Sequence, residues 1–373
     1  MKSIDYYRNR EQTYLKHFFL ERYLERVGFN ICSFKDDFVY VDGFSGPWKS
    51  RDEQFEDTSF MIAIQELRKV REGIAKQGRL PPTIRCVFVE KDPKAFRELQ
   101  HAVQGITDLE ITPIPGEFEQ VIPEVLKSIR RSFSLVFIDP TGWTGFGLQG
   151  IAPILQHAPG EVIVNFMFDY INRRFGVSFD DLFGGPGWDA AMTEDETIQL
   201  YSARMKVAGR FNHVTSTRIL NPTSDRTYFY LVYGTRHWKG LLEFRSVEKR
   251  FVEEQERVRL TAKQRKRIDK TGQTELFTGS PVSTTARTLE QERQDKIASA
   301  LRRLKDLVKE NERLQYEEVL GSLLEFPLVW QGDINDMIIN LRGNYLEVEG
   351  LQPRERTPKR GHIIVRKNRV TKD

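Results

Sequence analysis

The stretch Val39-Tyr40-Val41-Asp42-Gly43-Phe44-Ser45-Gly46-Pro47 decides the fold of this chain. Its first half continues an apolar, β-branched and aromatic run, which is typical of a buried strand. The second half predicts a tight loop, because glycine lacks a Cβ and tolerates a positive φ. We expect Gly43 and Gly46 to let the backbone approach a ligand closely at the carboxyl edge of a parallel sheet. This is where α/β proteins hold nucleotide-like cofactors.

Two further apolar strands each lead into an acidic residue. Residues 83–89 precede Glu90, residues 133–138 precede Asp139, and helical stretches separate the three strands. A carboxylate at the Glu90 position can accept hydrogen bonds from a ribose diol. The sequence therefore predicts that Asp42, Glu90 and Asp139 converge on one crevice.

Together these motifs resemble the class I S-adenosylmethionine-dependent methyltransferases. The resemblance implies that the loop after the first strand wraps the methionine part of the cofactor, and that Glu90 binds its ribose. Gly116-Glu117-Phe118 resembles the third motif of these enzymes, whose acid faces the adenine amino group. The cofactor-binding residues implied in this way are Asp42, Gly43, Phe44, Ser45, Gly46, Glu90, Lys91, Glu117, Phe118 and Asp139.

The dipeptide Asp139-Pro140 matches the start of the D/N-P-P-Y/F motif of nitrogen-directed methyltransferases. A carboxylate and a nearby backbone carbonyl at this point can accept hydrogen bonds from an exocyclic amino group. The chain departs from the motif at Thr141-Gly142, and Trp143 follows one place later as a surface on which a base would stack. The predicted catalytic residues are Asp139, Pro140 and Trp143, and the departure leaves the acceptor atom open.

A closer resemblance is to the three-Cys-motif partner protein family. Its counterparts occur in the same order along residues 10–245, at Lys16-His17 and at residues 41–47, 88–92 and 137–140. The resemblance implies a second protein that carries the three cysteines, itself of the radical S-adenosylmethionine type, and places Lys16-His17 over the cofactor pocket. The alternative for His17 is a packed or surface side chain. Arg173 and Arg174 enter a loop that we expect to select the substrate together with Lys16 and His17.

Alternating strands and helices predict an α/β fold with a parallel sheet, and the resemblance implies that this is a Rossmann-like class I methyltransferase sheet. Strands at 227–234 and 240–244 predict an antiparallel terminal hairpin, which dinucleotide-binding dehydrogenases lack. The first domain is expected at 1–268, with an N-terminal helix over 7–27 and an insertion around 170–215. A linker at 269–290 and a small domain at 291–373 follow. The small domain resembles a winged helix, with three helices before short strands at 345–348 and 362–365.

Charge gives weak support for a nucleic-acid partner. The net charge of the 373 residues is only +4, from 57 Lys and Arg against 53 Asp and Glu. Two segments, 257–270 and 354–372, are locally basic and can neutralise phosphates, although a solvated surface is the alternative. The two cysteines support neither a disulfide framework nor a cysteine-based metal site, and methyl transfer requires no metal.

Three functions remain open from the sequence. The leading one is an S-adenosylmethionine-dependent methyltransferase that acts on DNA or RNA, with a base nitrogen favoured. The second is a non-catalytic, cofactor-binding adaptor of the three-cysteine protein. The third, a dinucleotide-dependent oxidoreductase, leaves Asp139-Pro140 and the terminal hairpin unexplained. No apolar run is long enough to span a bilayer and no signal peptide is recognisable, so the expected location is the cytoplasm.

Overall fold

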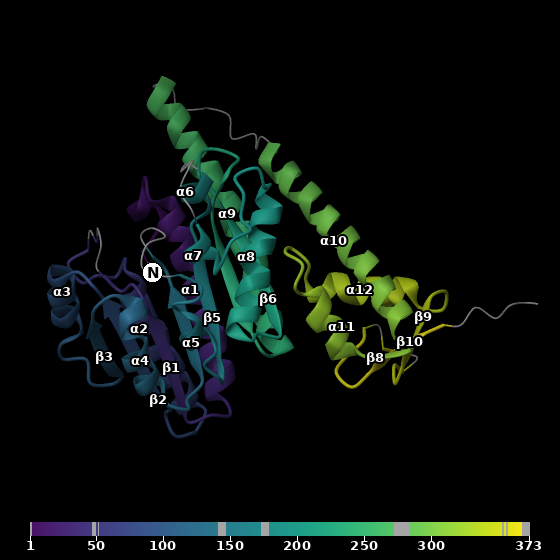
Figure 1. The fold of residues 1–373 in the computed structure, drawn as a ribbon, viewed down its shortest axis with the longest axis horizontal. Coiled ribbons are helices and arrows are strands. Elements are labelled where there is room, and N and C mark those ends of the chain that lie inside the picture. Colours follow the sequence, from purple (N-terminus) through teal and green to yellow (C-terminus); the bar gives the residue numbers. More distant parts are fainter. Residues whose placement is uncertain are drawn as a thin grey trace, which may run out of the picture. The chain divides into compact units, whose positions relative to one another are not determined.

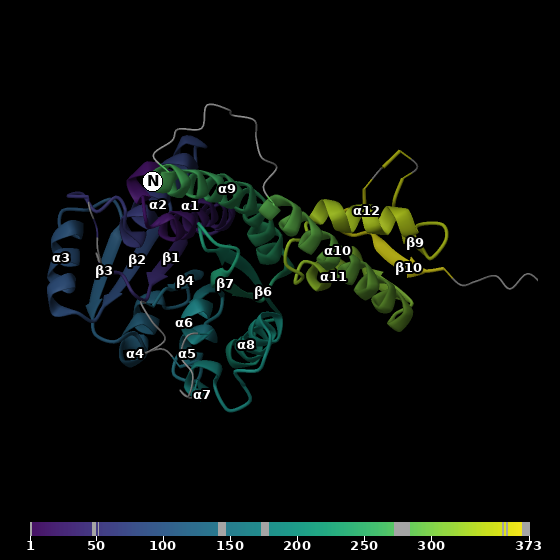
Figure 2. The same cartoon turned by 90° about the horizontal axis from the view of Figure 1, so that it is seen from above.

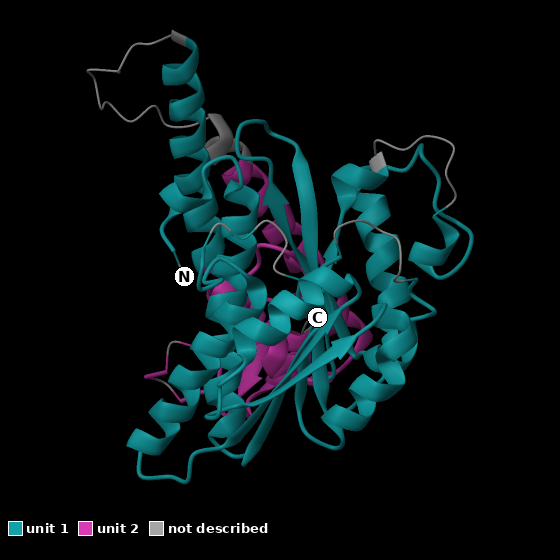
Figure 3. Cartoon of the chain, turned by 90° about the vertical axis from the view of Figure 1, so that its left-hand side faces the viewer, with its two compact units in different colours: residues 1–236, 250–276 teal, residues 237–249, 277–373 magenta. Residues whose placement is uncertain are grey.

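The computed structural model describes residues 2–46, 50, 52–140, 147–172, 179–271, 284–352, 354–355 and 357–367. The chain divides into two compact units, shown in Figure 3. The first comprises residues 1–236 and 250–276, and the second comprises residues 237–249 and 277–373. Helix α9 (Trp238–Thr271) contributes its first residues to the second unit and its remainder to the first. Most of the predicted linker, residues 272–283, lies outside the described residues, and residues 284–290 already belong to a helix.

The first unit is built on a seven-stranded sheet in the order β3-β2-β1-β4-β5-β7-β6 (Figure 1). The first five strands run parallel, and β7 pairs antiparallel with both β5 and β6. This is the predicted methyltransferase-like α/β fold, a mostly parallel sheet that ends in an antiparallel hairpin. The strand bounds are β1 Asp37–Asp42, β2 Thr83–Glu90, β3 Glu110–Pro115, β4 Ser134–Ile138, β5 Gly160–Phe166, β6 His213–Leu220 and β7 Thr227–Thr235.

Helices cover both faces of this sheet. Figure 2 shows α1 and α2 on one face and α4, α5 and α8 on the other. The second face holds a continuous apolar core that includes alternate residues of β1, Val39 and Val41. The helix bounds are η1 Ile4–Tyr7, α1 Glu11–Cys32, α2 Ser59–Lys76, α3 Pro93–Val103, α4 Phe118–Ile129, α5 Ala152–Leu155, α6 Phe168–Asn172, α7 Asp180–Phe183 and α8 Glu194–Gly209. Within the described ranges, none of the helices has both the length and the apolar character needed to cross a membrane.

The terminal hairpin is confirmed, but its second strand was assigned wrongly. The partner of β7 is β6, whereas residues 240–244 lie in helix α9. A short apolar run does not distinguish a strand from a helix, and here Leu241, Phe244 and Val247 are all buried at helical spacing. Strand β6 was not predicted, because its central residues Thr215-Ser216-Thr217 are polar in sequence although they are buried in the fold.

Part of the predicted insertion around 170–215 belongs to the regular strand and helix order. Helix α8 and the start of β6 occupy residues 194–215. A capping box begins α8, since Glu196 N donates to Thr193 Oγ1 over 3.3 Å and Thr193 N donates back to Glu196 Oε2 over 2.7 Å. The Thr-x-x-Glu spacing was visible in the sequence.

The second unit contains the predicted three helices and a small antiparallel sheet. In chain order these are α10 (Thr284–Glu310), β8 (Arg313–Gln315), α11 (Tyr316–Leu323), α12 (Gln331–Leu341), β9 (Leu346–Glu349) and β10 (Ile363–Arg366). The sheet order is β8-β10-β9, and β8 was not predicted from the sequence. Asp333 helps to begin α12. It is the third residue of the helix, and its Oδ2 accepts from Trp330 N over 2.8 Å.

A buried ion pair holds the start of α9 within the second unit. Arg245 and Glu248 are 1% and 0% exposed, and Arg245 Nη1 lies 2.5 Å from Glu248 Oε1. Arg245 Nε also donates to the carbonyl oxygen of Leu324 over 2.9 Å. Glu248 Oε2 accepts from Leu328 N and Trp330 Nε1, each over 3.3 Å. The hydrogen bonds make this pair tolerable in the interior, because neither charge is left without partners.

We therefore expect Glu248→Ala to destabilise the second unit by about 3–5 kcal/mol, because it leaves the Arg245 charge buried and uncompensated. Hydrogen exchange of the α11 and α12 amides measures the change. Asp306→Ala is the control, since it removes an exposed ion pair with Lys309 and should cost under about 0.5 kcal/mol. Equal protection in the two variants would contradict the role given to Glu248.

Candidate functional site

Four polar side chains lie at the carboxyl edge of the central strands. Asp42 ends β1, Glu90 ends β2, Asp139 follows β4, and Asn165 is the penultimate residue of β5. These strands are neighbours in the order β2-β1-β4-β5. Since side chains alternate along a strand and the adjacent Val41, Val89, Ile138 and Val164 face the apolar core, the four polar residues share the opposite face.

The loop after β1 is bonded to both neighbouring strands. Gly43 N donates to the carbonyl oxygen of Phe137 in β4 over 2.9 Å, and Ser45 N donates to that of Val89 in β2 over 2.8 Å. Ser45 Oγ donates to the carbonyl oxygen of Asp42 over 2.9 Å. The loop backbone is therefore fixed across the sheet edge, next to Glu90.

Gly43 lies in close contact with an aromatic ring. Its φ does not lie in the left-handed region. A Cβ at this position would lie 3.0 Å from the ring of Phe118, which also packs against Phe44 with ring centroids 5.8 Å apart. The glycine thus allows the first residue of α4 to pack directly on the loop.

Asp42 is fully buried, and its two oxygens accept hydrogen bonds from Phe44 N over 3.0 Å and Ser59 Oγ over 2.6 Å. Burial raises the pKa of Asp42 from 3.8 to about 6, against the lowering effect of these two bonds. The charge of Asp139 raises the pKa of Asp42 further and that of Lys16 lowers it. Asp42, Asp139 and Lys16 therefore lie within electrostatic range of one another.

Asp139 is held by two side chains. Lys16 Nζ in α1 forms an ion pair with its Oδ2, and Asn165 Nδ2 donates to its Oδ1 over 2.6 Å. Asn165 was not singled out in the sequence, although an asparagine directly after the apolar run of residues 162–164 was a usable signal. Pro140 is buried next to Asp139. Trp143, Arg173 and Arg174 lie outside the described residues.

The neighbouring residues Lys16 and His17 have different partners. His17 is 4% exposed, and its Nδ1 lies 3.2 Å from the hydroxyl of Tyr7. Burial lowers the pKa of His17 well below 6.5, which favours a neutral ring. His17 is thus a packed core residue, whereas Lys16 reaches the strand ends.

At the β2 end, Glu90 is buried and its Oε1 accepts from Asp92 N over 2.7 Å. The carbonyl oxygen of Glu90 accepts from Gly116 N over 3.0 Å, and Gly116 takes a positive φ of 139°. Glu117 is half-exposed and pairs with Lys91 over 3.8 Å. The third predicted motif therefore lies beside the end of β2.

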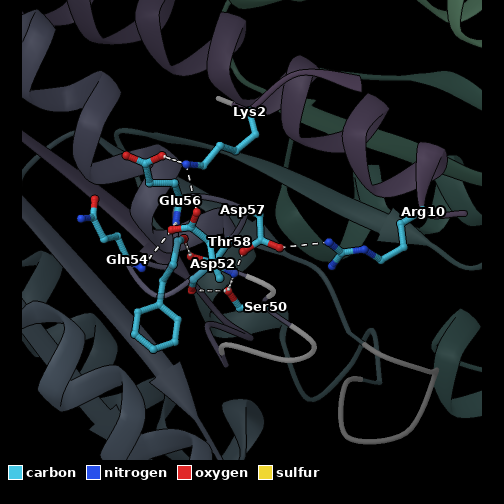
Figure 4. Close-up of polar contacts among 9 residues, drawn as sticks. Lys2, Arg10, Ser50, Asp52, Gln54, Glu56, Asp57 and Thr58 are labelled. Atoms are coloured by element: carbon cyan, nitrogen blue, oxygen red, sulfur yellow. Dashed lines mark hydrogen bonds and ion pairs between the residues drawn. The ribbon is translucent and has the colours of Figure 1, made fainter. Parts of the chain in front are cut away.

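The N-terminal segment anchors the connection from the loop after β1 to helix α2 (Figure 4). Asp57 accepts from Arg10 Nη2 over 3.0 Å and from Ser50 Oγ over 2.6 Å. Lys2 pairs with Asp52 over 2.9 Å and also contacts Glu56. Because α2 begins at Ser59, these contacts fix the residue that bonds Asp42.

The basic stretch in α9 is largely neutralised by acids of its own unit. Arg257 pairs with Glu254, Arg259 and Lys263 pair with Asp225, and Arg265 pairs with Asp5. The first four basic residues of this stretch therefore form ion pairs within the unit. This favours a solvated helix surface over a phosphate-binding one.

No family model matches the chain, and no curated protein matches it. Among solved structures, a Legionella pneumophila protein of the family DUF519 is 10% identical, with a TM-score of 0.33 over 60% of this chain and 84% of that one. Loganic acid methyltransferase with SAH is 12% identical, with a TM-score of 0.28 over 69% of each chain. At these TM-scores neither likeness assigns a ligand to this chain, and its own strand order defines the methyltransferase-like fold.

The buried Asp42 should lower stability at neutral pH. Because its folded pKa is raised, its protonated form stabilises the fold, and this contribution is lost as pH rises from 3.8 through about 6. A shift of about 2 units corresponds to roughly 3 kcal/mol. We expect Asp42→Asn to be more stable than the wild type at neutral pH by up to about that amount.

Urea unfolding at a series of pH values measures this effect. The stability gained by Asp42→Asn should shrink as the pH falls toward 3.8, the ordinary pKa of an aspartate. Asp108→Asn is the control of opposite sign, because the ion pair with Arg68 lowers the pKa of Asp108. A stability gain in Asp42→Asn that is the same at acid and neutral pH would be incompatible with this account.

Proposed function

We propose that the chain is an S-adenosylmethionine-dependent methyltransferase that acts on a base nitrogen of a nucleic acid. The main support is the placement of Glu90, Asp42 and Asp139 at the ends of three adjacent parallel strands, on one face of the sheet. Ligands of open α/β sheets bind at this edge. An oxidoreductase is disfavoured, because its dinucleotide fold lacks the antiparallel β6–β7 hairpin.

The polar groups at this edge of the sheet suit S-adenosylmethionine. Glu90 would accept hydrogen bonds from the ribose, and the fixed Gly43–Gly46 loop would lie along the methionine part. A positively charged ligand would favour the ionised form of the buried Asp42, which the protein alone disfavours. Bound S-adenosylmethionine would supply a methyl group already activated on its sulfonium.

Asp139 would orient the acceptor nitrogen. Its carboxylate is held in place by Lys16 and Asn165, and each of its oxygens has a further lone pair available to an N–H donor. A carboxylate fixed in this way positions the acceptor and receives its proton.

The second unit would serve as a docking module. Its order of helix, strand, two helices and two strands supports the winged-helix resemblance. Helix α12 carries Asp333 and Asp336 and no basic residue, which suits a protein surface better than a phosphate backbone. We propose that this unit contacts the three-cysteine protein that the family resemblance implies.

A non-catalytic adaptor is the second candidate, favoured by one observation. The ion pair with Lys16 neutralises the carboxylate that would otherwise receive the proton. An adaptor of this kind would bind the cofactor and pass no methyl group.

Calorimetric titration with S-adenosylhomocysteine tests the cofactor assignment. We expect the wild type to bind and Glu90→Gln to bind roughly 10- to 100-fold more weakly, because hydrogen bonds to a charged acceptor are lost. The matched control is Glu110→Gln, at the opposite end of the neighbouring strand β3 and paired with Arg85, which should leave the affinity unchanged. Absence of binding to the wild type would refute the cofactor assignment.

Radiolabel transfer from the cofactor distinguishes the enzyme from the adaptor. The enzyme should label DNA or RNA, and Asp139→Asn should lower the rate by roughly 100-fold or more, as for removal of a general base. Cofactor binding in Asp139→Asn should persist, because the proposal places Asp139 against the methyl acceptor and not among the cofactor-binding residues that the resemblance implied. A chain that binds the cofactor but labels no DNA or RNA, with or without the three-cysteine protein, would refute the nucleic-acid enzyme and leave the adaptor or an enzyme with another class of acceptor.

A further inference from the structure

Asn165 has an unused hydrogen-bonding group at the edge of the sheet. The residue is 2% exposed, in strand β5 next to Asp139. Its Nδ2 donates to Asp139 Oδ1 over 2.6 Å and lies 3.6 Å from Met167 Sδ. Its Oδ1 is buried and has no hydrogen-bond partner among the residues that the structure describes.

The orientation of this amide is fixed by its neighbour. A carboxylate only accepts hydrogen bonds, so the nitrogen of Asn165 must face Asp139 and the oxygen must face elsewhere. The register continues from the pair Ile138 and Val164, so that Asp139 and Asn165 are at the same level of adjacent strands. Two acceptors, a carboxylate oxygen and an amide oxygen, therefore lie close together at the end of β4 and β5.

Leaving a buried carbonyl without a partner is costly, and such groups in native structures call for an explanation. Among the other buried polar atoms without described partners, the hydroxyl of Tyr201 and the indole nitrogen of Trp188 lie in the aromatic cluster around Phe183 on the other face, and the hydroxyl of Tyr40 lies on the face of Asp42. Asn165 differs because it contacts the proposed catalytic carboxylate directly.

We propose that Asn165 Oδ1 recognises the methyl acceptor, by accepting one N–H of a primary amino group while Asp139 accepts the other. This rests on the proposed function and narrows it to the exocyclic amino group of a nucleobase. A ring nitrogen or a hydroxyl has at most one hydrogen to donate and would leave one of the two acceptors unpaired, which costs affinity.

Held between these acceptors, the amino nitrogen keeps its lone pair free to attack. That lone pair forms the new bond to the methyl carbon as the methyl–sulfur bond breaks and leaves its electron pair on sulfur. One of the two N–H protons then passes to the Asp139 carboxylate and on to water. Asn165 binds the amino group throughout and exchanges no proton.

The test measures the binding of single-stranded oligothymidylates to the full chain saturated with S-adenosylhomocysteine. Each oligonucleotide carries one central adenine, purine without the amino group, or N6,N6-dimethyladenine. Adenine should bind about 5-fold or more tightly than either analogue in the wild type. Asn165→Ala should reduce this preference to near unity while the affinity for S-adenosylhomocysteine stays unchanged.

Asn212→Ala is the matched control, because it also removes one side-chain hydrogen bond, to the carbonyl oxygen of Arg236, away from this edge. It should keep the preference for adenine. The wild-type comparison needs no variant, so a lack of preference for adenine there contradicts the proposal even if Asn165→Ala fails to fold.

The outcomes separate the two proposals. Failure of the wild type to bind S-adenosylhomocysteine would overturn the proposed function, and this inference with it. Binding of S-adenosylhomocysteine without a preference for the amino base would overturn only the role of Asn165. A preference for adenine that persists in Asn165→Ala would also overturn only the role of Asn165.

Discussion

The register of the parallel strands is the constraint on which the site depends. β1 lies between β2 and β4, and Asp42 pairs in register with Phe88 and Phe137. Glu90 and Asp139 therefore extend two residues beyond it at the same edge. Since side chains alternate with a period of two, a shift of one residue in either pairing would move an acid into the apolar core. The valines on the opposite face, such as Val41 and Val89, fix the register that makes the site.

The edge holds charge at a cost to stability. Asp42 is fully buried and its pKa is raised to about 6, so ionisation at neutral pH opposes folding. Asn165 leaves a buried oxygen without a described partner. Polar groups that lower the stability of the fold and lie together at a sheet edge are typical of sites that bind a ligand. Lys16, which approaches from α1, balances part of this charge.

Sequence periodicity predicted β1, β2 and β4 and their terminal acids, because buried strands followed by glycine or proline leave little choice. It failed where the signal is ambiguous. Residues 240–244 suit a strand or a helix, and only the burial of Leu241, Phe244 and Val247 on one side settles it. Lys16 and His17 were treated as a pair, yet successive helical residues point about 100° apart and meet different partners.

A crystal structure of the chain with S-adenosylhomocysteine tests the central claim most directly. The account predicts that the ribose hydroxyls lie within hydrogen-bonding distance of Glu90, that the ligand follows the loop after Asp42, and that its sulfur faces Asp139 and Asn165. A ligand bound at any other part of the sheet, or one that leaves Glu90 without contact, would contradict it.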